Sequence, residues 1–331
     1  MRLFSRLLFF TTGACAVAVA ACNGPTSSLA PVGTAAQTSR VKPMTTSSPT
    51  PIPFVYQTVD DPSSTKNEVT GINQLSKIVG VYGAGQGSTT PQSYTSQSPF
   101  TKFRGLNYPG AQGTFMTSLS SNKLQAGYVM APGNQNGTFG VTRIGGVWTL
   151  FADPNEGTGS NAVTEIFGIN DSEYAVGYYV NSSGSDAPFE LNVPTGVFTD
   201  IMPPGTTNAV ATGIDGKGNI AGWESTSAGA KGFILVNGTY YTYTYPGSTA
   251  TYALSLNWAD QIVGDYVDSS GNTHGFYLIG PTHGGATQVW QSIDEPNAAH
   301  GTWVTGINNH HDICGYYVDA NGIEHGFIAV P

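Results

Sequence analysis

Two short motifs near the end of the chain combine side chains that could ligate a metal ion or move protons. Asp268-Ser-Ser-Gly271-Asn-Thr-His274 and Asp319-Ala-Asn-Gly322-Ile-Glu-His325 share an Asp-x-x-Gly turn followed by a histidine. Asp-x-x-Gly is also typical of a tight hairpin, in which Asp bonds the backbone and Gly takes a positive φ. We expect turn chemistry at both motifs, with each histidine bridging its hairpin, and keep ligand or metal binding as the alternative.

A second set of carboxylates stands at or just before a proline that closes a predicted strand. Its members are Asp60, Asp61, Asp153, Asp294 and Glu295. If these strand ends share a face with the two hairpins, that face is acidic and could bind a cation or a basic partner. An EF-hand loop needs many more acids in a fixed order, and the sequence has none. A structural calcium ion is therefore the one cofactor left open, and no metal ligand is assigned.

Aromatic residues follow a repeated glycine once in each of six units. They are Tyr82, Tyr128, Tyr178, Trp223, Tyr266 and Tyr316. Such rings could stack on sugars, but a position repeated in every unit is more typical of packing between units. The candidate ligand-binding residues are Tyr82, Trp223, Tyr266 and Tyr316 together with Asp268, His274, Asp319 and His325.

No catalytic signature is present in the sequence. A Gly-x-Ser-x-Gly elbow, a His-Glu-x-x-His motif and a phosphate-binding glycine loop are all missing. Paired carboxylates could cleave a glycoside, but the sequence does not place two of them at a known separation. We name no catalytic residue.

The elements that must position these side chains are built from an internal repeat. A Gly-Ile-Asn turn leads into an apolar pair and a glycine, as in Gly71-Ile-Asn73 before Ile78-Val-Gly80. The glycines of the six units are Gly80, Gly127, Gly177, Gly222, Gly264 and Gly315, spaced by 47, 50, 45, 42 and 51 residues. The copy around Ser118-Leu-Ser120 is degenerate. If it were an insertion, the repeat would have five units.

A second sequence feature, a proline at the end of a predicted strand, recurs with nearly the same spacing as the glycine. Six predicted strands end in a proline, at Pro62, Pro109, Pro154, Pro204, Pro246 and Pro296, spaced by 47, 45, 50, 42 and 50 residues. A third strand opens on an aromatic residue, with Tyr94, Phe139, Phe189, Phe233, Phe276 and Phe327 as its marks. Four short strands in about 47 residues are typical of a propeller blade.

These marks predict an all-β domain over residues 54–331, a six-bladed β-propeller of four-stranded blades. The chain stops after the third strand of its sixth unit, and the missing fourth strand lies at the other end of the domain, Val55 to Asp60. We expect that N-terminal strand to complete the last blade and close the ring, which leaves few free edges.

The motifs Gly-Ile-Asn, Ile-Val-Gly and His-Gly-Phe resemble the bacterial extracellular HAF-repeat family, named for a His-Ala-Phe motif. The resemblance covers residues 54–331 and departs in having Gly for Ala and in keeping the His only at His274 and His325. It implies secretion and a repeated β-architecture, and it implies no established activity.

The first 53 residues are of a different kind. A basic start is followed by an apolar run, Leu7 to Ala21, which is too short for a membrane span and typical of a signal peptide. It ends in Val19-Ala-Ala-Cys22, which resembles a bacterial lipobox. The resemblance implies cleavage after residue 21 and acylation of Cys22. Cys15 is a weaker candidate, and secretory cleavage without lipid is the alternative.

Residues 22–53 are rich in Ser, Thr, Ala and Pro. Such a segment buries too little apolar surface to fold, so we expect a disordered tether. Cys314 is then the one cysteine of the domain, and we expect it to be a buried apolar residue. The export signal places the protein at the cell envelope, lipid-anchored, at the outer membrane on its periplasmic or its outer side.

Charge limits the partners. Charged residues make up 10% of the chain, against about 25% in average domains. Its formal net charge is −9, and loss of Arg2 and Arg6 with residues 1–21 makes the mature form −11. This acidity argues against nucleic acid, whose phosphates need Lys and Arg, and against a polybasic hold on anionic lipid.

From these patterns we expect a monomeric, non-catalytic binding module that contacts the membrane through its lipid and takes a glycan or an envelope protein as ligand. An envelope polysaccharide hydrolase or lyase and a structural scaffold remain alternatives. Perturbed carboxylates lining the channel would favour the enzyme. A large apolar patch would favour the scaffold.

Overall fold

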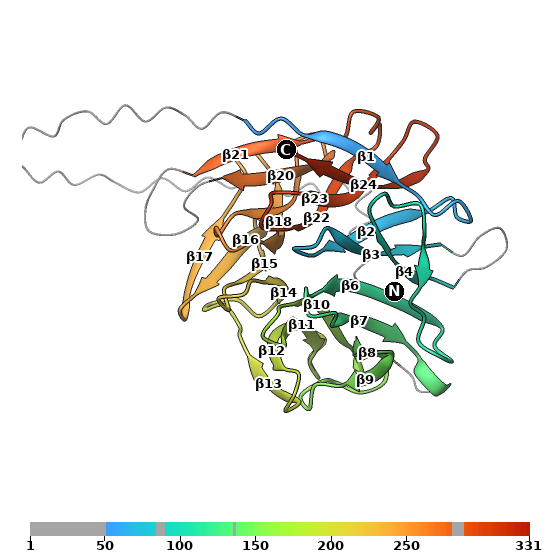
Figure 1. The fold of residues 1–331 in the computed structure, drawn as a ribbon. Coiled ribbons are helices and arrows are strands. Elements are labelled where there is room, and N and C mark those ends of the chain that lie inside the picture. Colours follow the sequence, from blue (N-terminus) through green and yellow to red (C-terminus); the bar gives the residue numbers. More distant parts are fainter. Residues whose placement is uncertain (1–50, 84–89, 135–136, 280–287) are drawn as a thin grey trace, which may run out of the picture. The chain divides into compact units, whose positions relative to one another are not determined.

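Six antiparallel sheets of four strands form a ring in the computed structural model (Figure 1). The structure describes residues 51–331 apart from 84–89, 135–136 and 280–287. Apart from two short 3₁₀ helices, η1 (Pro132–Asn134) and η2 (Gly159–Asn161), the regular elements of these residues are all strands. No helix in this part of the chain is long and apolar enough to cross a membrane. The predicted all-β, six-bladed propeller is confirmed.

The blades are numbered in chain order, from the innermost strand outward. Blades 1 and 2 contain β2 (Asn67–Ile72), β3 (Lys77–Tyr82), β4 (Gln92–Gln97), β5 (Arg104–Gly105), and β6 (Gly113–Leu119), β7 (Gln125–Met130), β8 (Thr138–Ile144), β9 (Val147–Phe151). Blades 3 and 4 contain β10 (Thr164–Ile169), β11 (Tyr174–Val180), β12 (Asp186–Asn192), β13 (Val197–Asp200), and β14 (Ala209–Ile214), β15 (Ile220–Thr226), β16 (Gly229–Val236), β17 (Thr239–Tyr243). Blades 5 and 6 contain β18 (Ala250–Leu256), β19 (Ile262–Val267), β20 (Thr273–Ile279), β21 (Val289–Ile293), and β22 (Thr302–Ile307), β23 (Ile313–Val318), β24 (Glu324–Val330), β1 (Val55–Val59). The degenerate copy around Ser118 is therefore a full blade.

The ring is closed by the N-terminal strand, as predicted. β1 pairs antiparallel with β24, in a register that runs from Val55 opposite Val330 to Val59 opposite Gly326. The backbone of Ile52 also exchanges two hydrogen bonds with the side-chain amide of Gln291 in blade 5, at 2.9 and 2.8 Å. The N-terminal segment therefore links blade 6 to blade 5 as well as completing blade 6.

The apolar core lies between blades rather than at one centre. One cluster joins Leu124 and Ala126 of blade 2 to Ile166 and Phe189 of blade 3. Inner strands such as β2 and β14 are buried along their whole length, whereas the outer strands consist mostly of exposed and half-buried residues. This is expected when each sheet packs on two neighbours through its inner part and meets water at its rim.

The repeated glycine of the second strand has a steric reason. The first strand of every blade carries a bulge, as between Ile166 and Gly168. Here the backbone of the first strand approaches the second closely. A Cβ added at Gly177 would lie 1.9 Å from the carbonyl oxygen of Glu165, and the other five glycines have the same contact at 1.9–2.3 Å. Only a residue without a side chain fits this position.

The asparagine of the Gly-Ile-Asn turn has two roles. In blade 3 the side-chain oxygen of Asn170 accepts hydrogen bonds from the backbone N–H groups of Ser172 and Tyr174, both at 3.0 Å. Its amide nitrogen donates to the carbonyl of Asp215 in blade 4 at 2.9 Å. The residue thus closes its own turn and fastens its blade to the next, which explains why an amide recurs there.

Local differences from the predicted strands are small. The fourth strand of blade 1 has only two residues, and beyond it the backbone N–H of Ser93 bonds the side chain of Asn107 while the carbonyl of Ser93 accepts the N–H of Leu106. In blade 2 the residue opposite the repeated glycine is Val141, and Phe139 lies two positions earlier. Cys314 is fully buried, and burial raises the pKa of its thiol to about 12, so it is a buried apolar residue as expected.

Candidate functional site

The ring has two faces that differ in their connections. We call turn face the side that carries the turns from strand one to two and from strand three to four. We call loop face the side that carries the connections from strand two to three and from strand four to the next blade. The predicted hairpins after Asp268 and Asp319 lie on the loop face, and the Gly-Ile-Asn turns lie on the turn face.

On the loop face each predicted histidine lies between two aspartates. The Nδ1 atom of His274 is 2.7 Å from Asp294, and its Nε2 atom is 3.5 Å from Asp268. In blade 6, His325 has the same contacts, with Asp60 at 2.7 Å and Asp319 at 3.7 Å. Each histidine therefore bridges its hairpin to the acid at the end of the fourth strand.

The hydrogen bonds of these hairpins are those of turns. Hydrogen bonds from the backbone and side chain of Asn272 lower the pKa of Asp268 to about 2. The backbone N–H of Ile323 likewise lowers the pKa of Asp319. Among the described residues, no group of three or more His, Cys, Asp or Glu side chains is placed to hold a metal ion.

The predicted acidic residues are not one exposed surface. Asp294 is exposed, and Asp60 and Asp61 are half-buried. Asp153 and Glu295 are 1% and 4% exposed, and each accepts a hydrogen bond from a backbone N–H two residues further on. These last two acids close the loops between blades, as the proline that follows each of them suggests.

The predicted aromatic residues pack between strands and blades. Trp223, Tyr266 and Tyr316 are 8%, 8% and 3% exposed, and Tyr82 is half-buried. Tyr316 stacks on Trp303 at 4.8 Å, and Tyr266 stacks on Tyr245 at 3.6 Å. Tyr82 and Tyr266 lie one residue later than the other four, so they point to the opposite side of their blades. In their place, blades 1 and 5 have Val81 and Asp265.

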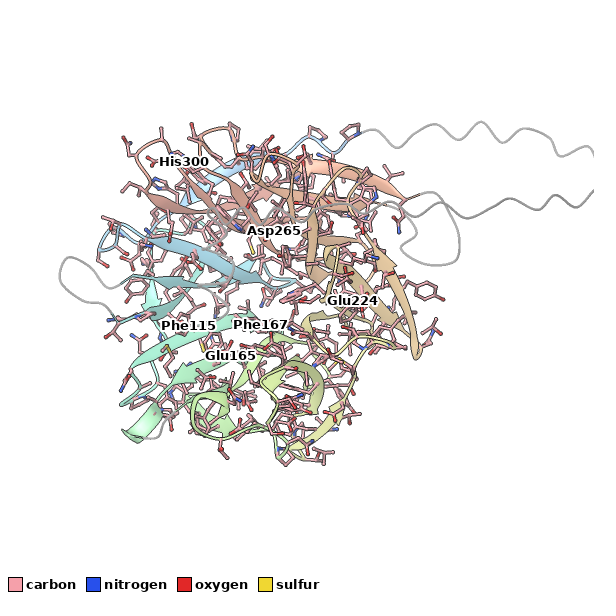
Figure 2. The ribbon with its side chains drawn as sticks, turned by 180° about the vertical axis from the view of Figure 1, so that it is seen from behind. Phe115, Glu165, Phe167, Glu224, Asp265 and His300 are labelled. Atoms are coloured by element: carbon pink, nitrogen blue, oxygen red, sulfur yellow. The ribbon has the colours of Figure 1, made fainter. Side chains whose placement is uncertain are left out.

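Three buried carboxyl groups belong to the cross-strand pairs that contain the residue after the repeated glycine: Glu165 opposite Tyr178, Asp265 opposite Tyr252, and Glu68 opposite Val81. Glu165 of β10 and Asp265 of β19 are marked in Figure 2, and Glu68 of β2 is the third. They are 8% exposed or less. Burial raises the pKa of Glu68 to about 8 and that of Glu165 to about 7, and it also raises the pKa of Asp265.

These perturbed carboxyls are out of reach of a large substrate. A general acid must contact the atom that it protonates, whereas Glu165 accepts a hydrogen bond from buried Tyr178 at 3.1 Å and Asp265 accepts one from the backbone of Val304 at 2.8 Å. None of the three carboxyls lines the axial cavity described next. Their burial does not favour the polysaccharide hydrolase or lyase.

An axial cavity opens on the turn face. The end of strand one lines it in all six blades, with Phe167 of blade 3 and Leu254 of blade 5 among the lining residues. The cavity volume is about 90 Å³, which corresponds to about three water molecules at roughly 30 Å³ each. Ligand pockets usually measure about 300–1,000 Å³. A sugar residue does not fit inside, so a larger ligand must lie across the mouth.

Trp258, which sequence reasoning missed, stands at this mouth. Its side chain is 51% exposed, although it follows Asn257 in the turn of blade 5. The indole lies against Gly216 of blade 4, where an added Cβ would be 2.5 Å from the indole nitrogen. The ring is thus held on the turn face with one side free. In the sequence the signal is a lone tryptophan where the other turns have polar residues or glycine.

Two amides continue the mouth beside the tryptophan. The side-chain oxygen of Asn309 accepts the backbone N–H of Trp258 at 2.9 Å, and the oxygen of Gln74 accepts the backbone N–H of Asn309 at 2.7 Å. Both amides are oriented by these bonds. Their NH₂ groups make no hydrogen bond to other described residues and are left to donate to a ligand. The mouth thus combines an exposed aromatic face with two fixed amide donors.

Comparison with known proteins supports the fold. No protein-family model matches the chain, and no curated protein matches its sequence. A putative TolB from Agrobacterium tumefaciens has 10% identity and a TM-score of 0.52, over 80% of this chain and 90% of the other. A protein of unknown function from Dyadobacter fermentans has 10% identity and a TM-score of 0.53, over 83% and 97%.

TolB from Acinetobacter baumannii is more distant. It has 7% identity and a TM-score of 0.46, and the match covers 72% of this chain but only 59% of that protein. At these identities the likeness concerns the fold alone. The chain is similar in architecture to propeller proteins such as the Agrobacterium TolB.

Proposed function

We propose that this protein is an exported, lipid-anchored propeller that binds a glycan on its turn face without catalysis. The half-exposed ring of Trp258 at the mouth of the axial cavity carries the proposal. An aromatic ring combines a large apolar contact area with a low entropic cost of ordering. The apolar face of a sugar can lie on such a ring while its hydroxyls meet the amide donors of Asn309 and Gln74.

The alternatives have less support. The exposed large hydrophobic residues do not gather in one patch. They form two cross-strand pairs, Val55 with Val330 and Ile144 with Val147, and three single residues in other blades or turns, Leu75, Val197 and Trp258. A scaffold surface would be expected to be contiguous. The perturbed carboxyls are buried, as described above. An envelope protein as ligand remains an outcome of the binding test.

Binding is tested on a glycan and polysaccharide array with the full-length protein in detergent. Trp258→Ala is expected to abolish the selective signals, because it removes the stacking surface. Leu75→Ala is the matched control, since Leu75 is also exposed on a turn of the same face, at 63%. Equal loss in both variants, or signals untouched by Trp258→Ala, would contradict the site. An array without any signal would contradict glycan binding and direct cross-linking to envelope proteins.

Anchoring is a separate part of the proposal and rests on the lipobox-like segment before Cys22. In a bacterial host, Cys22→Ser is expected to move the protein from the membrane fraction to the soluble fraction, because its acyl chains are lost. Cys15→Ser is the control for the second candidate cysteine and is expected to leave the protein on the membrane. The reverse pattern would transfer the anchor to Cys15.

A further inference from the structure

The charges of the domain are unevenly distributed. Residues 62–152, which include blades 1 and 2, contain six Lys or Arg and a single acid, the buried Glu68. Residues 153–331 contain two lysines and eighteen acids. The net charge of −9 therefore conceals a basic sector in the first two blades.

Five of these cations gather on the turn face, and we call them the basic patch. They are Lys77, Lys102, Arg104, Lys123 and Arg143. Lys77 begins β3, Arg104 begins β5 and Arg143 stands one residue before the end of β8, and these strand ends all lie at the turn face. Lys123 lies in the turn between β6 and β7, and Lys102 just before β5.

The cations are close enough to act on one another. The pKa of Lys77 is lowered by burial first and then by the positive charges of Arg104, Arg143 and Lys123. Like charges that destabilise each other in this way are stabilised by an anion. Acids of the neighbouring blades border the patch on both sides. Asp312 of blade 6 accepts hydrogen bonds from Ser76 and Asn308 at 2.9 Å each, and Asp171 of blade 3 accepts the backbone N–H of Ser121 at 2.6 Å.

Part of the patch is held in place by packing. The guanidinium of Arg143 lies 5.3 Å from the ring centre of Trp148 and donates to the side chain of Gln125 at 3.1 Å. A guanidinium in a fixed position suits a discrete carboxylate or phosphate group. A membrane surface, in contrast, needs only a general positive potential. The fixed guanidinium of Arg143 therefore favours a ligand that carries discrete anionic groups.

The basic patch is continuous with the mouth of the cavity. Going around the mouth from Trp258 in blade 5, the turns carry Asn309 in blade 6, then Gln74 and Lys77 in blade 1, and Lys123 in blade 2. A chain of several sugars that lies on the indole would pass over the amides and reach the cations. The aromatic platform and the positive charges thus belong to one surface.

We propose that the ligand of the turn face is an acidic polysaccharide, whose carboxylate or phosphate groups lie on the basic patch while a sugar ring lies on Trp258. This inference rests on the proposed function and adds the chemical class of its ligand. Each exposed ion pair contributes little, and the contribution falls with salt, so the patch selects for charge while the tryptophan supplies contact area.

The test compares polygalacturonate with its methyl ester, which has the same backbone without the charges. Full-length protein in detergent is expected to bind polygalacturonate at least about fivefold tighter than the ester, and high salt should remove the difference. Lys123→Gln with Arg104→Gln should reduce binding of polygalacturonate about fivefold to tenfold. The matched control neutralises Lys66 and Lys217, two exposed lysines that already pair with Glu324 and Asp260.

The outcomes separate the inference from the proposed function. Equal affinity for both polymers, lost in Trp258→Ala, would overturn the acidic class and leave glycan binding intact. No binding of either polymer, together with a silent array, would contradict the proposed function itself. If Lys123→Gln with Arg104→Gln abolished binding to vesicles of phosphatidylglycerol and phosphatidylcholine but left polygalacturonate unaffected, the patch would be a membrane contact and the inference would be wrong.

Discussion

The buried carboxyl of Glu68 makes the stability of the propeller depend on pH in an unusual direction. Its Oε2 atom accepts no hydrogen bond from the described residues, and burial followed by the charge of Glu324 raises its pKa from 4.5 to about 8. Between these two values the folded protein holds a proton that the unfolded chain has lost. Folding therefore takes up a proton, and stability falls as pH rises through this window.

The magnitude follows from the linkage. One proton corresponds to about 1.4 kcal/mol per pH unit, so Glu68 alone lowers the free energy of unfolding by about 2–3 kcal/mol between pH 5 and pH 7. Glu165, whose pKa is raised to about 7, adds to the slope over the same range. Asp268 has the opposite sign, but its pKa of about 2 places its effect below pH 4.

Glu68→Gln isolates the effect, because an amide has the shape of the neutral acid and does not ionise. Urea unfolding followed by tryptophan fluorescence at pH 5, 6, 7 and 8 should show a steep fall for the unmodified protein and a shallower one for the variant. Glu224→Gln, on the half-buried part of β15, is the control and should keep the original slope. Stability that rises from pH 5 to pH 7, or an identical slope in Glu68→Gln, would refute the reasoning.

Three further substitutions test the repeat. Asn170→Asp removes the donor to the carbonyl of Asp215 and should cost about 1–3 kcal/mol in urea unfolding, whereas an unchanged midpoint would mean that this bond contributes nothing. Gly177→Ala places a Cβ 1.9 Å from the carbonyl oxygen of Glu165 and should cost about 1–3 kcal/mol or more; a variant with normal thermal stability would contradict the steric argument. Glu173→Gly, in the turn between β10 and β11 of blade 3, relieves a positive φ of 63° and should raise stability by about 0.5–1 kcal/mol, so a lower melting temperature would count against it.

The fold could be predicted because its requirements repeat. Each blade needs a residue without a side chain where the bulge of strand one meets strand two. The sequence has a glycine at this position in all six blades, from Gly80 in blade 1 to Gly315 in blade 6. Each turn needs a side-chain oxygen for its own N–H groups, which Asn73 and its equivalents supply. The closing strand could be predicted because the last repeat unit lacks a fourth strand, whereas one additional strand, Val55–Val59, precedes the first unit.

The site could not be predicted in the same way because it does not repeat. Trp258 occurs once, and its only sequence signal is its place in a turn where the other blades have polar residues or glycine; that its ring is held at the mouth depends on Gly216 of the preceding blade. The basic patch joins residues up to 66 positions apart, from Lys77 to Arg143, and it becomes a patch only because strand ends of two blades meet on one face. Conversely, Trp223 and Tyr316 were candidates because they repeat, and they repeat because they pack.

Departures from the repeat therefore deserve most weight as signs of function. Thr70, Thr117, Thr212 and Thr305 stand at the bulge of their strands, and each hydroxyl donates to a carbonyl of the next blade at 2.6–2.9 Å. In blades 3 and 5 the same position holds Phe167 and Leu254, which cannot make that bond, and both line the axial cavity. In these two blades an apolar side chain in the cavity wall replaces a hydrogen bond between blades. The blade that carries Leu254 also carries Trp258, so this departure from the repeat lies in the blade of the proposed site, whereas the ring of Phe167 in blade 3 packs on Tyr128 and Tyr178.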